Sequence, residues 1–267
     1  MIDPIFQSYN DYFISKYNPD GTEEWTIETN KVNALTAGSD GSIYVAGSSW
    51  GDLDGQTNSG VEDALISKYS ADGTKEWTRL LGTSWLDEGN ALTIGNDGSI
   101  YIAGYTSGYT WEDFDGQTIS GDSDAFISKY SADGTKEWTR LIGTSKTDKG
   151  NALTTGSDGS IYIAGYTEGD LDGQINSYGR IIRNDSDAFI SKFNPDGTKE
   201  WTKLLGSDSY DGANAITTDY DGNAIYSSEG ANAITTGNDG SIYIAGYTEG
   251  DLDGQTYNGG KSDAFIS

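Results

Sequence analysis

The sequence contains no cysteine and no histidine among its 267 residues. Disulfide bonds, thiolate zinc sites, cysteine nucleophiles, Ser-His-Asp catalysis and imidazole acid–base chemistry are therefore excluded. Proline is scarce, with 3 residues against 37 glycines, which suits many tight turns and few broken strands. The longest apolar runs are only a few residues, so we expect no membrane insertion.

Basic residues are also few, at 16 against 42 acidic residues, for a net charge of −26. A surface this negative repels phosphate backbones and anionic lipids, so nucleic acid and membrane surfaces are not expected partners. It attracts cations instead. The first residues, 1–7, lack the basic and apolar regions of a standard secretory signal.

The most prominent feature that is present is an internal repeat. The stretch 124–143 returns almost unchanged at 63–82 and 187–206, a looser copy spans 11–26, and a fragment of it ends the chain at 263–267. Self-similarity on a period of roughly 50–60 residues indicates a repeat architecture in which each period is one structural unit.

Each period divides into four short segments with strand chemistry, here 89–95, 99–106, 124–130 and 136–142. Asp-Gly turns join the first segment to the second and the third to the fourth, while longer polar loops make the other connections. Four short antiparallel strands per period predict a β-propeller blade. A parallel β-solenoid is the main rival, but its turns are usually shorter. A helical repeat is excluded because no apolar period of 3.6 residues is present.

We therefore predict an all-β protein with one β-propeller domain at 11–267, preceded by a lead-in at 1–10 and built from four-stranded antiparallel blades. The predicted blades lie near 30–82, 83–143 and 144–206, with a composite blade from 11–29 and 231–267. The stretch 212–230 is an irregular, duplicated hairpin. These segments give four full blades plus a partial one, or four to five sectors, and a piece of a longer propeller is the third interpretation.

The phase of the repeat predicts how the ring closes. Segments 11–17 and 24–29 lack first and second strands of their own, and the hairpin 231–248 lacks a fourth strand, so we expect them to pair. This pairing would leave no open sheet edge. It would also leave 263–267 as a surplus strand that could exchange between molecules, so we expect a monomer, with a strand-exchanged oligomer as the alternative.

Two long signatures carry a family resemblance. The motif Asp-Ala-Phe-Ile-Ser-Lys-Tyr, followed by Asp-Gly-Thr and Trp, alternates with Gly-Asn-Ala and Asp-Gly-Ser-Ile-Tyr-Ile-Ala-Gly-Tyr-Thr. Together they resemble the bacterial SBBP β-propeller repeat, most closely that of large cyanobacterial surface or secreted proteins. The resemblance implies a propeller and an extracellular or cell-surface location, and it implies no catalytic residues. The Asp-Gly-Thr-x-x-Trp motif also resembles quinoprotein propellers, which implies a blade-docking role for Trp25, Trp77, Trp138 and Trp201.

The long loops between the second and third segments carry paired carboxylates in an Asp-x-Asp-Gly motif. The pairs are Asp52 and Asp54, Asp113 and Asp115, Asp170 and Asp172, and Asp251 and Asp253. Two such carboxylates with a following glycine can converge on a hard cation, which makes Ca²⁺ the candidate cofactor. The other interpretation is a turn in which each aspartate accepts hydrogen bonds from nearby backbone amides.

Aromatic residues outside the repeated positions gather in the same long loops. They are Trp50, Trp85, Tyr109, Trp111, Tyr178, Tyr210 and Tyr257. In a propeller all the long loops lie on one face, and exposed aromatic side chains on a rigid scaffold are typical of recognition surfaces. We expect this face to bind a glycan or a protein, with the tryptophans as anchors. The alternative is that each ring covers a neighbouring loop.

These observations favour a non-enzymatic binding or surface-display propeller. An active site needs one asymmetric constellation, whereas most charged residues here recur in every blade. Two alternatives stay open. One is a carboxylate-dependent enzyme, a lyase or glycan hydrolase, on the same face. The other is a purely structural spacer.

Overall fold

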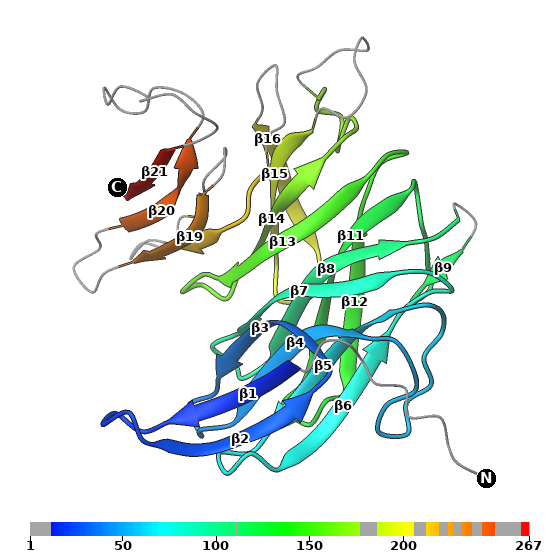
Figure 1. Cartoon of the computed structure of the whole chain (residues 1–267). Helices are drawn as coiled ribbons and strands as arrows, with labels where there is room; N and C mark the ends of the chain where they lie inside the picture. Colours follow the sequence, from blue (N-terminus) through cyan, green and yellow to red (C-terminus); the bar gives the residue numbers. More distant parts are fainter. Residues whose placement is uncertain are drawn as a thin grey trace.

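The computed structural model describes residues 12–109, 112–176, 186–205, 212–218, 224–226, 231–236, 242–248 and 263–266. All regular secondary structure in these ranges is β-strand (Figure 1). Across the same ranges, no helix has the length and apolar character needed to span a bilayer.

Three antiparallel sheets have four strands each, and each sheet is one blade. The first blade contains β3 (Lys31–Ala37), β4 (Ile43–Ser49), β5 (Asp63–Tyr69) and β6 (Lys75–Leu81). The second contains β7 (Asp87–Ile94), β8 (Ile100–Ser107), β11 (Ser123–Tyr130) and β12 (Lys136–Ile142). The third contains β13 (Asp148–Thr155), β14 (Ile161–Thr167), β15 (Asp187–Phe193) and β16 (Lys199–Leu205). In every blade the strands follow one another across the sheet in chain order. The predicted all-β propeller of four-stranded antiparallel blades is confirmed.

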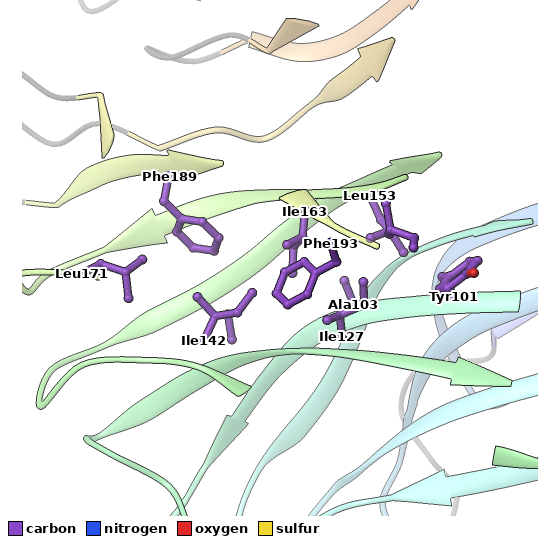
Figure 2. Packing of buried hydrophobic residues seen from close by; sticks show 11 residues of the cluster. Tyr101, Ala103, Ile127, Ile142, Leu153, Ile163, Leu171, Phe189 and Phe193 are labelled. Atoms are coloured by element: carbon purple, nitrogen blue, oxygen red, sulfur yellow. The ribbon is translucent and has the colours of Figure 1, made fainter. Parts of the chain in front are cut away.

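The middle strands of each blade are buried on both faces because other blades stack against them. All eight residues of β11 are buried. Figure 2 shows the apolar layer between the second and third blades, where Ile127 of β11 lies near Ile163 and Phe193. Burial of such side chains stabilises the fold by about 1.5–3 kcal/mol each. The repeated Ile and Phe positions of the sequence are therefore the inter-blade core.

The innermost strands β3, β7 and β13 each contain a β-bulge at an asparagine. The bulge turns the asparagine side chain toward the next blade. Asn33 Nδ2 donates to the Gly89 carbonyl at 3.1 Å, and Asn90 Nδ2 donates to the Gly150 carbonyl at 2.9 Å. These repeated hydrogen bonds join successive blades at their inner edges.

The outer strands dock through tryptophan, as the motif implied. Trp25, Trp77 and Trp138 each donate from Nε1 to a backbone carbonyl of the next blade's last turn, at 3.2–3.3 Å. The glycine of that turn lies against the indole ring in each case. The blade-docking role is therefore confirmed for these three residues.

The two ends of the chain differ from the prediction. Strands β1 (Tyr12–Tyr17) and β2 (Glu23–Thr29) pair with each other, while β19 (Ala231–Thr236), β20 (Ile242–Thr248) and β21 (Asp263–Ile266) form a separate three-stranded sheet. The predicted pairing of 11–29 with 231–248 is wrong for this structure, and the described sheets do not close into a ring (Figure 1). The remaining short strands are β9 (Asp113–Phe114), β10 (Gln117–Thr118), β17 (Ile216–Thr218) and β18 (Ala224–Tyr226).

The surplus strand explains this difference. β21 has the sequence that begins the third strand of other blades, and it pairs with β20 in the register of that strand: Asp263 lies opposite Thr248, as Asp124 lies opposite Thr106. β20 and β21 are separated in sequence only by residues 249–262, so bringing them together costs less entropy than bringing the distant N-terminal hairpin to the same edge. The predicted strand-exchanged oligomer stays a prediction.

Candidate functional site

The blades present two different ends to solvent. At one end lie the short Asp-Gly turns, in which the glycine has a positive φ and the aspartate accepts a hydrogen bond from the amide two residues on, as Asp72 Oδ1 does from Thr74 N at 3.0 Å. Hydrogen bonds from Ser70 and Thr74 lower the pKa of Asp72 to about 2. The other end carries the longer loops and is called the long-loop face below. Because the turns are nearly identical between blades, the long-loop face is the candidate site.

Exposed aromatic side chains lie on this face. Trp50 is 73% exposed, Tyr109 is 51% exposed and Trp85 is 42% exposed. The rings of Trp85 and Tyr109 meet edge to face, with centroids 5.7 Å apart and an interplanar angle of 80°. These large apolar surfaces are available to a partner. The other predicted aromatic residues, Trp111, Tyr178, Tyr210 and Tyr257, lie outside the described residues.

Hydrogen bonds fix the loops that carry Trp85 and Tyr109. Glu112 Oε2 accepts from the Tyr109 amide at 2.9 Å, and Glu112 Oε1 accepts from the Ser84 hydroxyl. The Trp85 carbonyl accepts from the Val61 amide at 3.1 Å. Three long loops therefore support one aromatic pair, which is the preorganisation that a binding site requires.

The Asp-x-Asp-Gly loops are tight hairpin turns. Asp54 and Gly55 both have positive φ, at 51° and 76°, and Leu53 and Gln56 exchange two backbone hydrogen bonds. This is the two-residue hairpin geometry that an Asp-Gly pair favours. Asp115 and Asp172 have the same backbone conformation, at 55° and 50°.

The two carboxylates of each motif have different partners. The second aspartate lies against a lysine of the outer strand: Asp54 Oδ2 is 2.9 Å from Lys75 Nζ, and Asp115 and Asp172 pair with Lys136 and Lys199. The first accepts a loop amide, as Asp52 does from Asn58 at 2.9 Å; Asp113 and Asp170 accept from Gly116 and Asn176. Asp251 and Asp253 lie outside the described residues. Within the described ranges, no three acidic side chains converge as a metal site would require.

The predicted calcium binding is untested, and the lysine partners of the second aspartates favour the alternative interpretation as tight turns. A melting experiment separates the two. Because Lys75 already neutralises Asp54, we expect Ca²⁺ to raise the melting temperature no more than Mg²⁺ or NaCl at equal ionic strength. A ligand that binds only the native state would stabilise it in proportion to its affinity. A larger rise with Ca²⁺, lost in an Asp54→Asn, Asp115→Asn, Asp172→Asn variant, would instead establish the loops as calcium sites.

A second cluster on the long-loop face lies at the ends of the inner strands. Lys31 forms an ion pair with Glu88, and Glu88 Oε2 accepts from the Tyr105 hydroxyl at 3.0 Å. Burial raises the pKa of Tyr105, and Glu88 adds to the shift. Lys149 Nζ lies 3.9 Å from the centre of the Tyr105 ring, and burial lowers the pKa of this lysine.

Sequence reasoning missed this cluster. Lys31, Glu88 and Lys149 occupy one repeated position, two residues before the inner-strand asparagine, and the side chain there differs from blade to blade. A change of charge at one position of an otherwise constant strand was the available signal. Alternating charges let neighbouring blades attract one another, so the cluster also supports the inner edge of the face.

Comparison with known proteins places these observations in a family context. Residues 137–172 match the SBBP family, described as a beta-propeller repeat. The chain is 29% identical over 201 residues to Regulatory protein FlaEY of Caulobacter vibrioides, a match covering 70% of this chain and 21% of that protein. It is 25% identical over 170 residues to the uncharacterized WD repeat-containing protein L264 of Acanthamoeba polyphaga mimivirus, covering 57% of this chain and 12% of that one.

The chain thus spans well under half the length of both relatives. A crystal structure of a protein of unknown function from Bacteroides caccae aligns over 96% of this chain and 86% of its own, with a TM-score of 0.46 and 10% identity. The chain carries the SBBP β-propeller repeat, in agreement with the resemblance read from its motifs.

Proposed function

We propose that this protein is a non-enzymatic binding propeller whose long-loop face recognises a glycan. The observation that carries the proposal is the exposure of Trp50, Trp85 and Tyr109 on loops held by hydrogen bonds. Aromatic side chains provide large contact area at low entropic cost. Their flat faces suit the C–H surfaces of sugar rings, and the Glu112 carboxylate beside Tyr109 is a hydrogen-bond acceptor of the kind that sugar hydroxyls need.

The net charge of −26 favours a neutral glycan over an anionic one as the ligand. An anionic polysaccharide would be repelled at long range, whereas a neutral one would not. The proposed ligands are therefore neutral polysaccharides. The extracellular or cell-surface location remains a prediction from the family resemblance.

A protein ligand is the second candidate. It is favoured by the relative named as a regulatory protein and by the enrichment of tryptophan and tyrosine at protein interfaces. The enzyme alternative has less support, since the described loop aspartates are engaged by lysines or backbone amides and the relatives carry regulatory or repeat-protein names.

A panel of soluble neutral polysaccharides, namely mixed-linkage β-glucan, xylan and galactomannan, tests the proposal by affinity electrophoresis and calorimetry. We expect the wild-type protein to bind at least one of them. A Trp50→Ala, Trp85→Ala variant should bind about thirtyfold more weakly or worse, because a single hot-spot aromatic contributes about 2 kcal/mol or more.

The control replaces an exposed aromatic residue at the opposite end of the blades. Tyr17 is 59% exposed at the start of a short turn, so Tyr17→Ala removes similar surface away from the long-loop face. Affinity should be unchanged in this variant. Binding that survives the double tryptophan change, or no binding to any neutral polysaccharide, would contradict the glycan proposal and leave the protein ligand.

A further inference from the structure

Two buried carboxyl groups meet at the junction of the first and second blades. Asp63 begins β5 and is 1% exposed, and Asp87 begins β7 and is fully buried. A Cβ placed on Gly82 would lie 2.3 Å from Asp63 Oδ1 and 2.9 Å from Asp87 Oδ2. Both carboxyl groups therefore lie against Gly82, and a larger residue at this position would displace the two carboxyl groups.

One oxygen of each group anchors a loop of the long-loop face. Asp63 Oδ2 accepts from the Ser59 amide at 2.9 Å, and Asp87 Oδ2 accepts from the Thr83 amide at 2.7 Å and the Thr83 hydroxyl at 3.0 Å. The other oxygens, Asp63 Oδ1 and Asp87 Oδ1, are buried. The Thr106 hydroxyl lies beside Asp87 and opposes the rise of its pKa, whereas Asp63 Oδ1 receives no hydrogen bond from the described residues. Nor does a described lysine or arginine form an ion pair with either group.

The next junction repeats the arrangement. Asp124 and Asp148 are fully buried. Their Oδ2 atoms accept from the amides of Ser120 at 2.9 Å and Thr144 at 2.6 Å. Asp124 Oδ1 lacks a partner among the described residues, and the Thr167 hydroxyl lies beside Asp148. Gly143 lies against Asp124 as Gly82 does against Asp63. Each of the two junctions therefore buries two carboxyl groups with no described cation beside them.

A bound proton would remove one of the two buried charges. Two buried carboxylates without a counter-charge repel each other and have lost their hydration, and both effects favour the neutral form. Protonation of one group removes a charge and adds a donor to the pair. In agreement, burial raises the pKa of Asp87 to about 7, with the Asp63 charge adding to the shift, and burial likewise raises the pKa of Asp124 to about 6.

We propose that each of these two junctions binds one proton, held by its pair of buried carboxyl groups, and that this proton keeps the loops of the long-loop face in place. The loop role rests on the proposed function; the bound proton does not. The proton acts on Trp85 through Thr83: the Trp85 amide donates to Thr83 Oγ1 at 3.2 Å, and the Thr83 amide donates to Asp87 Oδ2 at 2.7 Å. Loss of the proton places two negative charges directly under this chain of hydrogen bonds.

Other titratable groups near the junctions have partners of their own. The Glu62 side chain contacts Ser48 and Lys31, and Glu88 contacts Lys31 and Tyr105. At the second junction Glu168 adds to the raised pKa of Asp148, whose largest cause is burial. Asp87 and Asp124, one at each junction, are therefore the groups expected to change charge between about pH 5 and pH 8.

The sign of the effect follows from the raised pKa values. A carboxyl group that holds its proton more tightly when folded stabilises the fold fully below the unfolded pKa near 3.8, and this contribution is lost as the pH rises through 6 to 7. Stability against urea should therefore fall between about pH 5 and pH 8. Asp87→Asn should flatten this dependence and raise stability at pH 8, because an amide keeps the Thr83 acceptor and supplies a permanent donor toward Asp63.

The control is Glu23→Gln, which removes one exposed charge far from the junctions and should leave the pH dependence unchanged. Carbon-13 NMR of the aspartate carboxyl groups in the wild-type protein gives a second readout, with at least two groups titrating near pH 6–7. Hydrogen exchange at pH 8 gives a third: the amides of Thr83 and Trp85 should exchange about tenfold more slowly in Asp87→Asn than in the wild type.

Parallel stability curves for the wild type and Asp87→Asn, or aspartates that all titrate below about pH 5, would overturn the bound proton. A pH dependence abolished by millimolar Ca²⁺ would also overturn it, since a cation would then occupy the pair. Equal exchange at Thr83 and Trp85 would overturn the role in the loops. Because none of these measurements uses a glycan, failure of glycan binding would contradict the proposed function alone.

Discussion

Replacement of Gly104 with alanine is expected to be among the most destabilising additions of a single methyl group to this protein. A Cβ at this position would lie 1.8 Å from the Glu88 carbonyl oxygen and 2.8 Å from its carbon. These are backbone atoms of the bulged inner strand, so no side-chain rotation can relieve the contact. We expect a loss of about 3 kcal/mol or more in the free energy of unfolding, and a melting temperature lower by about 10 °C.

The matched control is Gly51→Ala. No atom lies within 4 Å of the Cβ position there, and Gly51 does not have a positive φ. The change of residue is the same, but the melting temperature should stay within about 2 °C of the wild type. Gly47 and Gly165 have the same 1.8 Å contact in the neighbouring blades, so their alanine variants should behave as Gly104→Ala does. Equal stability of Gly104→Ala and Gly51→Ala would refute the packing described for the inner strands.

The second large effect is expected at the blade-docking tryptophans. Trp138 contacts the turn of the third blade through its ring and donates to the Pro195 carbonyl at 3.2 Å. Arg140 lies over the same ring at 5.4 Å and donates to the Gly197 carbonyl at 2.9 Å. Trp138→Ala removes the centre of this contact, and we expect a loss of about 3 kcal/mol in urea unfolding experiments.

Trp50→Ala is the control for this change. Trp50 is largely exposed, so its removal should alter stability by no more than about 0.5 kcal/mol. The two substitutions delete the same side chain from a repeated and from an unrepeated position. Similar losses in both variants would contradict the distinction between docking and ligand-facing tryptophans on which the proposed function depends.

Most of the fold could be predicted from the repeat, because the sequence within each repeat specifies its own turns and strands. The predicted segments 89–95 and 136–142 correspond to β7 (Asp87–Ile94) and β12 (Lys136–Ile142), since Asp-Gly turns set their ends and alternating apolar residues set their faces. The strand pairing that would close the ring could not be predicted from the repeat. Two nearly identical segments compete for the edge of β20, and sequence similarity alone cannot rank them.

The candidate site was predictable only in part. Unrepeated aromatics such as Trp50 and Trp85 stood out because a core position would recur in every blade. The junction aspartates gave no such signal, because Asp63 and Asp124 recur at one position of the repeat, as scaffold residues do. Their burial arises from the stacking of one blade on the next, a contact between residues of adjacent repeats that no single repeat reveals.

Hydrogen–deuterium exchange of the protein with and without the polysaccharide that binds it best tests the central claim most directly. We predict protection of residues 50–60, 83–88 and 107–109, which carry or support Trp50, Trp85 and Tyr109. The short turns at 71–74 and 132–135, at the opposite end of the blades, should exchange at unchanged rates. Protection confined to the short turns, or absent from both ends, would contradict the assignment of the long-loop face as the binding surface.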